Sequence, residues 1–458
     1  MLRIHHSFGA ACLTAVLGAV AACSSDETTS APRVFGDGGV DATVAPPSDA
    51  PREGPDAKVT FSFGSNGRDL ATSIAVTADG KVVVAGNFQG AIPFGPVTIS
   101  AGATSPRDGF VAFLDEALKP QKGFAFSSGN AFLASVGDNQ VAVVASLSAS
   151  TQIGGSAVAA LDARDVAVMA FRSNGDLQGH RIVGGPGDDE IFAMGTSGDG
   201  ELALLMDGQF QLGDVDGGVA LVPSVERSLI TLAMGRGGPK WLSAKALGPM
   251  PWATAISKAG LVMAVATKDG VTLGEVPLSG SANPGEHGSP AFSRFSPTGV
   301  PLRSGLWSTA AGDAPLGGHV LQDDDGTVLL AASIKGPVSF GGRDVPGEGG
   351  VVVMRIQADG GVTWAKRLGG PHVPAYPKVR RDASGDLVVL SALDSGAAPM
   401  VYRLSPTGDV RAAIKLKPIA KLRELVDVAP SAGDWAVVGH TEDAAGHEDV
   451  VVVRYASL

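Results

Sequence analysis

Three carboxylates stand side by side in a glycine-rich turn, a grouping that could bind a cation or supply a catalytic acid and base. They are Asp188, Asp189 and Glu190. Calcium takes about six to eight oxygen ligands in ordered spacing, and the sequence has no Asp-x-Asp-x-Asp-Gly series with a distal Glu. It also has no His-x-x-x-His pair, Gly-x-Ser-x-Gly elbow or Walker loop. We therefore expect solvated turns here, with no metal, no cofactor and no catalytic residue. Calcium remains an alternative, and the three acids are kept as candidate ligand contacts.

Aspartate also recurs beside short apolar segments. One series precedes the first strand of a repeated unit and the other begins the third strand. The series are Asp69, Asp189 and Asp313, and Asp108, Asp165 and Asp449. Catalysis rarely needs the same group in several repeats, whereas a short side-chain acceptor can hold the amides of a turn. We interpret these residues as structural turn aspartates, with a metal or catalytic ring as the alternative.

Aromatic and histidine side chains in connecting loops are the remaining candidates for ligand contact. Trp252, His372 and Tyr376 fall in segments that lead into first strands, and such segments line one mouth of a ring-shaped repeat protein. Only 5% of the residues are aromatic, which is lean for a surface that stacks on carbohydrate. These three residues are therefore weak candidates.

A strand–turn–strand repeat positions all of these residues. A short strand, a Gly/Asp/Asn turn and a dense apolar strand recur seven times, and the turn residues tolerate positive φ in tight hairpins. A second hairpin follows in each unit, which makes four strands per unit. This pattern predicts an all-β fold, a seven-bladed β-propeller with four-stranded blades. The apolar strands begin at Val82, Val141, Leu202, Leu261, Val328, Leu387 and Trp435.

The ends of the repeat predict how the ring closes. The last unit stops after its third strand, at Val450 to Tyr455, and residues 58–64 read like a fourth strand. An N-terminal strand that completes the last blade would also cover an edge that invites aggregation. The chain has 63 Gly and 29 Pro, and 44% of its residues are hydrophobic, so its glycines indicate repeated turns and not disorder.

The N-terminus resembles a bacterial lipoprotein signal. Arg3 precedes about 14 small or apolar residues, too few for a membrane-spanning helix, and Val20-Ala21-Ala22-Cys23 resembles a lipobox. Residues 1–22 would be removed and Cys23 would carry the lipid. An ordinary secretory signal with a chance cysteine is the alternative. The mature chain would then hold one cysteine and no internal disulfide. Ser24 favours delivery to the outer membrane by resemblance to enterobacterial sorting rules.

A disordered acidic linker is expected between the anchor and the ring. Residues 23–57 are rich in Ser, Thr, Pro, Ala and Asp, and their two arginines and seven acids give a net charge of −5. The propeller would occupy residues 58–458. The whole chain carries −11 and has no basic run, which excludes nucleic acid as a partner because phosphate binding needs clustered Lys and Arg.

The repeat resembles the SBBP-type β-propeller repeats of secreted bacterial proteins. The first copy matches best, through Asp69, Ile74-Ala75-Val76, Gly86-Asn87-Phe88, Pro93-Phe94-Gly95 and Asp108-Gly109-Phe110-Val111. The second and fourth copies are degenerate. The resemblance spans about 400 residues and implies an architecture, with no catalytic residue.

These observations predict a monomeric, lipid-anchored propeller of the bacterial cell envelope. Its preferred function is a non-enzymatic binding or scaffold module for an unknown protein or glycan, because repeat rings with variable loops suit such contacts. A propeller glycan hydrolase or lyase is one alternative, and it requires the recurring acids to converge on the ring axis. An outer-membrane assembly factor is another.

Overall fold

The structure is a computed structural model, and its described part begins at residue 51 and ends at residue 456. The chain divides into two compact units, residues 1–38 and residues 39–458, and the described part belongs to the second unit. Between residues 228 and 252 only the backbone is described. The internal gaps are 101–106, 128–130, 136–138, 149, 154, 161–163, 185–186, 198–200, 209–227, 236–237, 246–249, 268–270, 274–275, 279–288, 298–299, 307, 310–316, 341–342, 370–376, 392–398 and 432–433.

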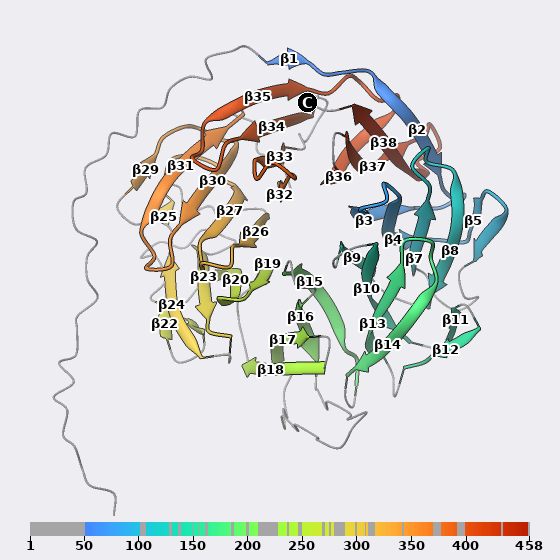
Figure 1. Cartoon of the computed structure of the whole chain (residues 1–458), viewed down its shortest axis with the longest axis horizontal. Coiled ribbons are helices and arrows are strands. Elements are labelled where there is room, and N and C mark those ends of the chain that lie inside the picture. The colour runs from blue at the N-terminus through green and yellow to red at the C-terminus, as the bar shows by residue number, and fades with distance from the viewer. Residues whose placement is uncertain are drawn as a thin grey trace, which may run out of the picture. The chain divides into compact units, whose positions relative to one another are not determined.

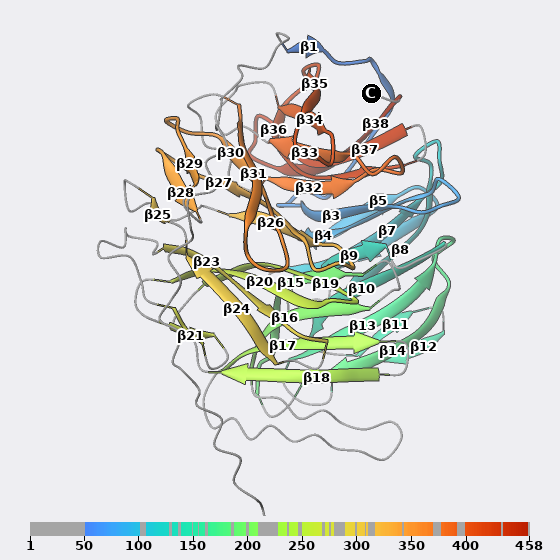
Figure 2. The same ribbon diagram turned by 60° about the vertical axis from the view of Figure 1, so that its left-hand side comes forward.

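The described residues form an all-β propeller without helices, in which the sheets stand around one centre (Figures 1 and 2). Six sheets are antiparallel blades of four strands each. Three of them, from the innermost to the outermost strand, are β3 (Leu70–Val76), β4 (Val82–Phe88), β7 (Asp108–Leu114) and β8 (Pro120–Phe126); β9 (Ala131–Ser135), β10 (Gln140–Leu147), β13 (Asp165–Arg172) and β14 (Leu177–Val183); and β15 (Glu190–Thr196), β16 (Leu202–Gly208), β17 (Ser228–Gly235) and β18 (Gly238–Lys245).

The other three four-stranded blades follow the same order, but the last of them takes its outermost strand from the N-terminal end of the described chain. They are β19 (Met250–Ser257), β20 (Gly260–Thr267), β23 (Ser289–Phe295) and β24 (Pro301–Leu306); β26 (Gly318–Gln322), β27 (Val328–Ser333), β30 (Val351–Ile356) and β31 (Val362–Leu368); and β36 (Leu422–Pro430), β37 (Asp434–Glu442), β38 (Glu448–Ala456) and β2 (Ala57–Phe63).

The prediction of seven four-stranded blades is wrong, because six sheets have four strands and the remaining large sheet has five. That sheet has the order β1-β35-β34-β33-β32. Its extra strand comes from the segment predicted to be a disordered linker: Arg52 and Glu53 pair in parallel with Ile414 and Lys415. Its strands are β1 (Arg52–Glu53), β32 (Lys378–Arg381), β33 (Leu387–Ser391), β34 (Met400–Leu404) and β35 (Val410–Lys415).

Small hairpins lie between the second and third strands of several blades, where the sequence indicated only a turn. Where burial is described, each pair buries two or three apolar side chains, such as Ile92, Phe94 and Ile99. The four pairs are β5 (Ala91–Phe94) with β6 (Val97–Ser100), β11 (Thr151–Ile153) with β12 (Ser156–Val158), β21 (Val271–Leu273) with β22 (Val276–Leu278), and β28 (Val338–Phe340) with β29 (Arg343–Val345). The other edge of β28 pairs with β25 (Ser308–Thr309).

The core lies between consecutive sheets, which explains why the second strand of a blade is apolar throughout. Successive side chains of a strand point to opposite faces of its sheet. In β4, Val82 and Val84 pack against residues of the β36–β38 sheet, whereas Val83 and Ala85 pack against residues of β10 and β13. The five-stranded sheet packs in the same way, with one apolar cluster on each side.

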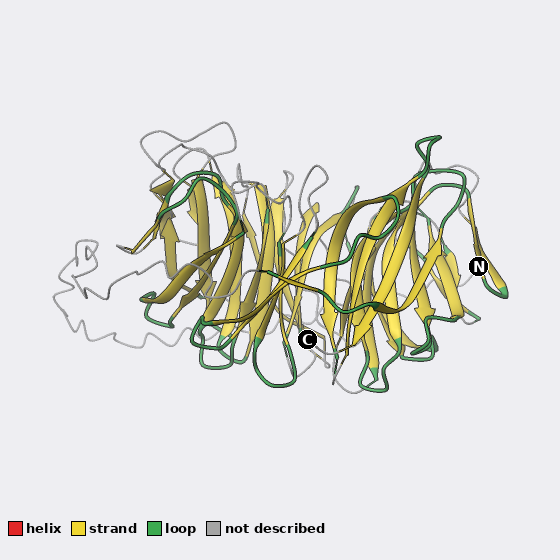
Figure 3. Ribbon diagram, turned by 90° about the horizontal axis from the view of Figure 1, so that it is seen from above, coloured by secondary structure: helices red, strands yellow, loops and turns green. Residues whose placement is uncertain are grey.

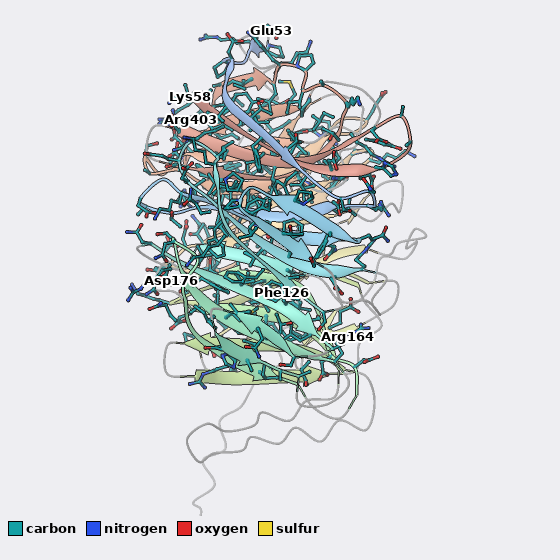
Figure 4. The ribbon with its side chains drawn as sticks, turned by 90° about the vertical axis from the view of Figure 1, so that its right-hand side faces the viewer. Glu53, Lys58, Phe126, Arg164, Asp176 and Arg403 are labelled. Atoms are coloured by element: carbon teal, nitrogen blue, oxygen red, sulfur yellow. The ribbon has the colours of Figure 1, made fainter. Side chains whose placement is uncertain are left out.

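Contacts between innermost strands run around the whole ring. Each of β3, β9, β15, β19, β26, β32 and β36 contacts the next, and β36 contacts β3. In Figure 3 the strands run between the two faces of the ring and the loops gather at both faces. Arg164, which precedes β13, and Asp176, in the turn after β13, mark these opposite faces (Figure 4). We call the face at which first and third strands begin the entry face.

The N-terminal strand lies where the sequence predicts it. β2 pairs with β38 along most of its length, with Phe61 opposite Val452 and Phe63 opposite Val450. The ring of Phe63 lies 5.2 Å from that of Phe94 at a steep angle, so β2 also packs on the first blade. Lys58 forms an ion pair with Asp434 at 2.7 Å.

Candidate binding site in the central cavity

The innermost strands surround a cavity of about 220 Å³. Its lining includes residues of β3, β9, β15, β19, β26, β32 and β36. On one side the lining residues are small or neutral, such as Thr72, Ala193, Gly195 and Thr254. Small side chains on these strands leave the room that larger ones would fill.

The other side of the cavity is charged. The three neighbouring strands β26, β32 and β36, with the residue after β26, supply every charged side chain of the lining, together with its histidine. These residues are His319, Asp323, Lys378, Arg380, Arg381 and Asp427. Three basic and two acidic side chains leave one excess positive charge when the histidine is neutral, in a chain whose net charge is −11.

Asp427 anchors this charged side. Its side chain is fully buried, and its Oδ2 accepts a hydrogen bond from Nη2 of Arg380 at 2.7 Å. The same oxygen accepts from the amide of Ile74 at 3.3 Å, and Oδ1 accepts from the amide of Val428 at 2.8 Å. A register shift in β36 between Leu425 and Asp427 places this carboxylate. A buried carboxylate needs such donors, and here they fix the guanidinium of Arg380 in return.

His319 and Lys378 lie beside that ion pair. Nε2 of His319 is 3.4 Å from Nη1 of Arg380. Burial, with the charges of Arg380 and Lys378, holds the pKa of His319 well below its usual value, so the ring is neutral at pH 7. Burial also lowers the pKa of Lys378, while the charge of Asp427 acts in the opposite direction. Among the described residues, the ammonium of Lys378 has no hydrogen bond or ion pair. A second Arg–Asp pair, Arg381 with Asp323 at 2.7 and 2.8 Å, closes the far end of β32.

The acids predicted from the recurring series lie elsewhere. Asp69 is buried, and its oxygens accept hydrogen bonds from the amide and hydroxyl of Ser65 and from the amide of Gln89. It therefore holds the loop that leads into β3 and does not line the cavity. Burial raises the pKa of Asp69 despite these hydrogen bonds, and the charge of Asp449 raises it further.

The two aspartate series meet in pairs over a glycine, which the sequence did not indicate. An ideal Cβ on Gly64 would lie 2.0 Å from Oδ1 of Asp449 and 2.9 Å from Oδ2 of Asp69. On Gly184 it would lie 1.7 Å from Oδ1 of Asp165 and 2.7 Å from Oδ2 of Asp189. Each glycine directly follows the outermost strand of a blade, so one pair joins a third strand to the first strand of the next blade. Asp108 is buried at the start of β7.

The remaining predicted contacts are also away from the cavity or outside the described part. Asp188 is exposed, and Glu190 begins β15 with Oε2 4.0 Å from Nη1 of Arg164. Trp252 lies within β19 at a register shift, and not in the loop that the sequence suggested. Four of the predicted site residues lie outside the described part: Cys23, Asp313, His372 and Tyr376.

Sequence reasoning missed Lys378, Arg380 and Asp427. A usable signal was present: in Lys378-Val379-Arg380 the charged residues flank a core valine, whereas the innermost strands β3, β15 and β19 line the cavity mainly with small or apolar residues. Charged residues on the innermost strand of a blade therefore indicate a polar site at the centre of the ring.

Within the described residues, no group of three or more His, Cys, Asp or Glu side chains could hold a metal ion. A search of the same residues finds no helix of the length and apolarity needed to cross a membrane.

The order and contacts of the sheets define the class of this chain, an all-β propeller. No protein-family model matches the sequence, so the resemblance to SBBP-type repeats stays a prediction. No curated protein matches it either.

Solved structures with a similar arrangement are distant. A protein of unknown function from Dyadobacter fermentans is 11% identical, with a TM-score of 0.43 over 88% of this chain and 100% of that chain. The polysaccharide lyase Uly1 is 9% identical, with a TM-score of 0.45 over 90% and 94% of the two chains. The WD40 β-propeller domain of Doa1 is 12% identical, with a TM-score of 0.30 over 71% and 92%.

Proposed function

We propose that this protein is a lipid-anchored propeller of the bacterial cell envelope that binds a ligand without transforming it, through the central cavity. The observation that carries the proposal is a cavity with basic side chains in which both acidic side chains already form ion pairs. Asp323 is bonded to Arg381 and Asp427 to Arg380. Such a site has groups that hold a ligand and no carboxylate left to act as acid or base.

A hydrolase fits this site poorly. Glycoside hydrolysis uses two carboxyl groups roughly 5–10 Å apart on either side of the scissile bond. Asp69 and Asp189, which would have to converge on the axis, lie instead beside Gly64 and Gly184 between blades. The described acids therefore favour binding over hydrolysis.

We also propose that the five-stranded sheet is the seventh blade of one ring. Apolar clusters join it to the β26–β31 sheet on one side and to the β36–β38 sheet on the other. Its innermost strand, β32, contacts both β26 and β36. The seven copies of the strand–turn–strand repeat in the sequence agree with this count.

A capture experiment tests the binding proposal. The mature protein is applied to a glycan array and, separately, to solubilised bacterial envelope. Thr196→Trp fills the cavity from β15, whereas Thr363→Trp places the same ring on the exposed outermost strand β31. We expect a ligand that the wild type and Thr363→Trp retain and that Thr196→Trp loses, with unchanged circular dichroism. Equal capture by both variants would contradict the cavity site. Capture of outer-membrane assembly proteins by both variants would favour the assembly-factor alternative.

A polysaccharide lyase is the second candidate, and one observation favours it. A neutral His319 lies beside Arg380, and a neutral imidazole can take a proton next to a carboxylate that a guanidinium neutralises. The ultraviolet absorbance of an unsaturated sugar product, measured with uronate-containing polysaccharides, tests this function. Product formation by the wild type and not by His319→Gln would overturn the non-enzymatic proposal.

A further inference from the structure

We propose that the cavity recognises one carboxylate group, which Lys378 and Arg380 bind together. This inference rests on the proposed binding function and names the chemical class of the ligand.

Lys378 is one of the two cations that would bind the carboxylate. Val379 packs in the apolar core, and because side chains alternate along a strand, Lys378 and Arg380 share the other face of β32. Both line the cavity. Lys378 is half-buried, and its ammonium has no hydrogen-bond or ion-pair partner in the described part of the chain. A cation withdrawn from water is costly unless an anion meets it, so this position favours an anionic ligand.

Arg380 is the second cation that would bind the carboxylate. Nη2 bonds Oδ2 of Asp427, and the fully buried Asp427 is itself held by the amides of Ile74 and Val428. The guanidinium is thereby fixed before a ligand arrives. Its other N–H groups can bind a planar carboxylate, for which guanidinium geometry is suited.

Charge and size set the class of the anion. The lining has three basic and two acidic side chains, so a single negative charge balances the cavity and a dianion such as phosphate does not. The volume of about 220 Å³ is below the roughly 300–1,000 Å³ of pockets for drug-sized ligands. The ligand is therefore a small monocarboxylate, either free in solution or carried on a terminal uronic acid of a glycan.

Lys378 lies at the entry face. It is the first residue of its strand, and first strands begin at that face. A sugar carboxylate that enters there reaches Lys378 before it reaches Arg381 and Asp323 at the other end of β32.

Isothermal titration calorimetry on the mature protein tests the proposal. The probes are acetate, glucuronate, a glucuronate-terminated oligosaccharide, glucose and inorganic phosphate. We expect the carboxylates to bind at least tenfold more tightly than glucose and phosphate. Tighter binding of the oligosaccharide than of free glucuronate identifies the glycan as the source, and equal binding identifies the free acid. Either result supports the proposal that the cavity recognises a carboxylate. Phosphate or glucose binding as tightly as glucuronate overturns it.

Variants separate this inference from the binding function. Lys378→Met should weaken glucuronate binding at least tenfold and Lys378→Arg should restore most of it. Lys366→Met, at a half-buried position on the outermost strand β31, should leave it unchanged. Unchanged binding in Lys378→Met overturns the inference. If a neutral ligand is captured and Thr196→Trp blocks it, the binding function stands and the carboxylate inference fails; if no ligand is captured, the binding function fails.

Discussion

Two aspartates and a glycine form the joint between consecutive blades at two places in the ring. Asp69 and Asp449 enclose Gly64, and Asp165 and Asp189 enclose Gly184. The glycine has no side chain, and this absence lets the third strand of one blade and the first strand of the next approach the same point. The sequence recurrence of aspartate thus has a structural basis in turns and joints.

Adding one methyl group tests this joint. Gly64→Ala and Gly184→Ala place a Cβ far inside van der Waals contact with a carboxylate oxygen, and we expect each to cost about 1–3 kcal/mol in the free energy of unfolding. Gly179→Ala on β14 is the matched control, since nothing lies within 4 Å of the Cβ that alanine would add there and the change should be nearly neutral. Urea denaturation measures all three, and equal stability of the three variants would contradict the joint.

The buried, neutral His319 should make the free energy of unfolding depend on pH. Burial holds its pKa well below the unfolded value of about 6.5, so below pH 6.5 the unfolded chain binds a proton that the folded chain does not. The contribution of His319 to the free energy of unfolding is therefore fully present above pH 6.5. It is lost as pH falls toward the folded pKa, by at most about 1.4 kcal/mol per pH unit.

Unfolding titrations from pH 7.5 to 5 measure this slope. His319→Gln should reduce it, and His447→Gln, at a surface residue beside Asp443, is the control for loss of a histidine. A wild-type slope identical to that of His319→Gln would count against a buried neutral imidazole.

At the residue scale the recurring aspartates could be recognised from the sequence, whereas the charged residues of the cavity were not. The recurring aspartates are visible because they repeat at fixed places in the chain. Lys378, Arg380 and Asp427 occur once each, on two different sheets, and only the packing of these consecutive sheets brings them together. Asp427 also depends on a strand irregularity that no composition rule indicates.

At the scale of elements, the apolar second strands were the strongest signal. They begin within one residue of the expected positions, as in β4 at Val82, β27 at Val328 and β33 at Leu387. Both faces of such a strand are buried, so its apolar run is continuous and easy to recognise. β1 was missed because it has only two residues, both charged and exposed, and its pairing partner lies more than 350 residues away.

Removing N-terminal strands tests the closure of the last blade. A variant that lacks residues 1–54 keeps β2 and should unfold near the temperature of the mature protein. A variant that lacks residues 1–64 loses Phe63 from the core and exposes the edge of β38, so we expect a much lower unfolding temperature and aggregation. Differential scanning calorimetry and size-exclusion chromatography report the two effects. Equal behaviour of the two variants would show that β2 does not stabilise the blade.

At the scale of the whole molecule, the proposed lipid anchor would hold the propeller at a membrane. Cys23→Ser removes the thiol that would carry the lipid, so the protein should move from the membrane fraction to the soluble envelope fraction with its ligand binding intact. Ser24→Ala is a control that keeps the thiol. Fractionation with immunodetection measures the distribution, and a membrane-bound Cys23→Ser protein would overturn the tether.

β1 and β2 also determine how the ring carries mechanical load. With the proposed anchor at Cys23, a pull along β2 would act on the β2–β38 pairing in shear, so its hydrogen bonds would resist together and would not open one after another. The β1–β35 pairing takes part of the same load on a neighbouring sheet before it reaches β2. Under the proposed tether, force on the chain would therefore enter the ring at its outermost strands, and the innermost strands that line the cavity would not be the first to bear it.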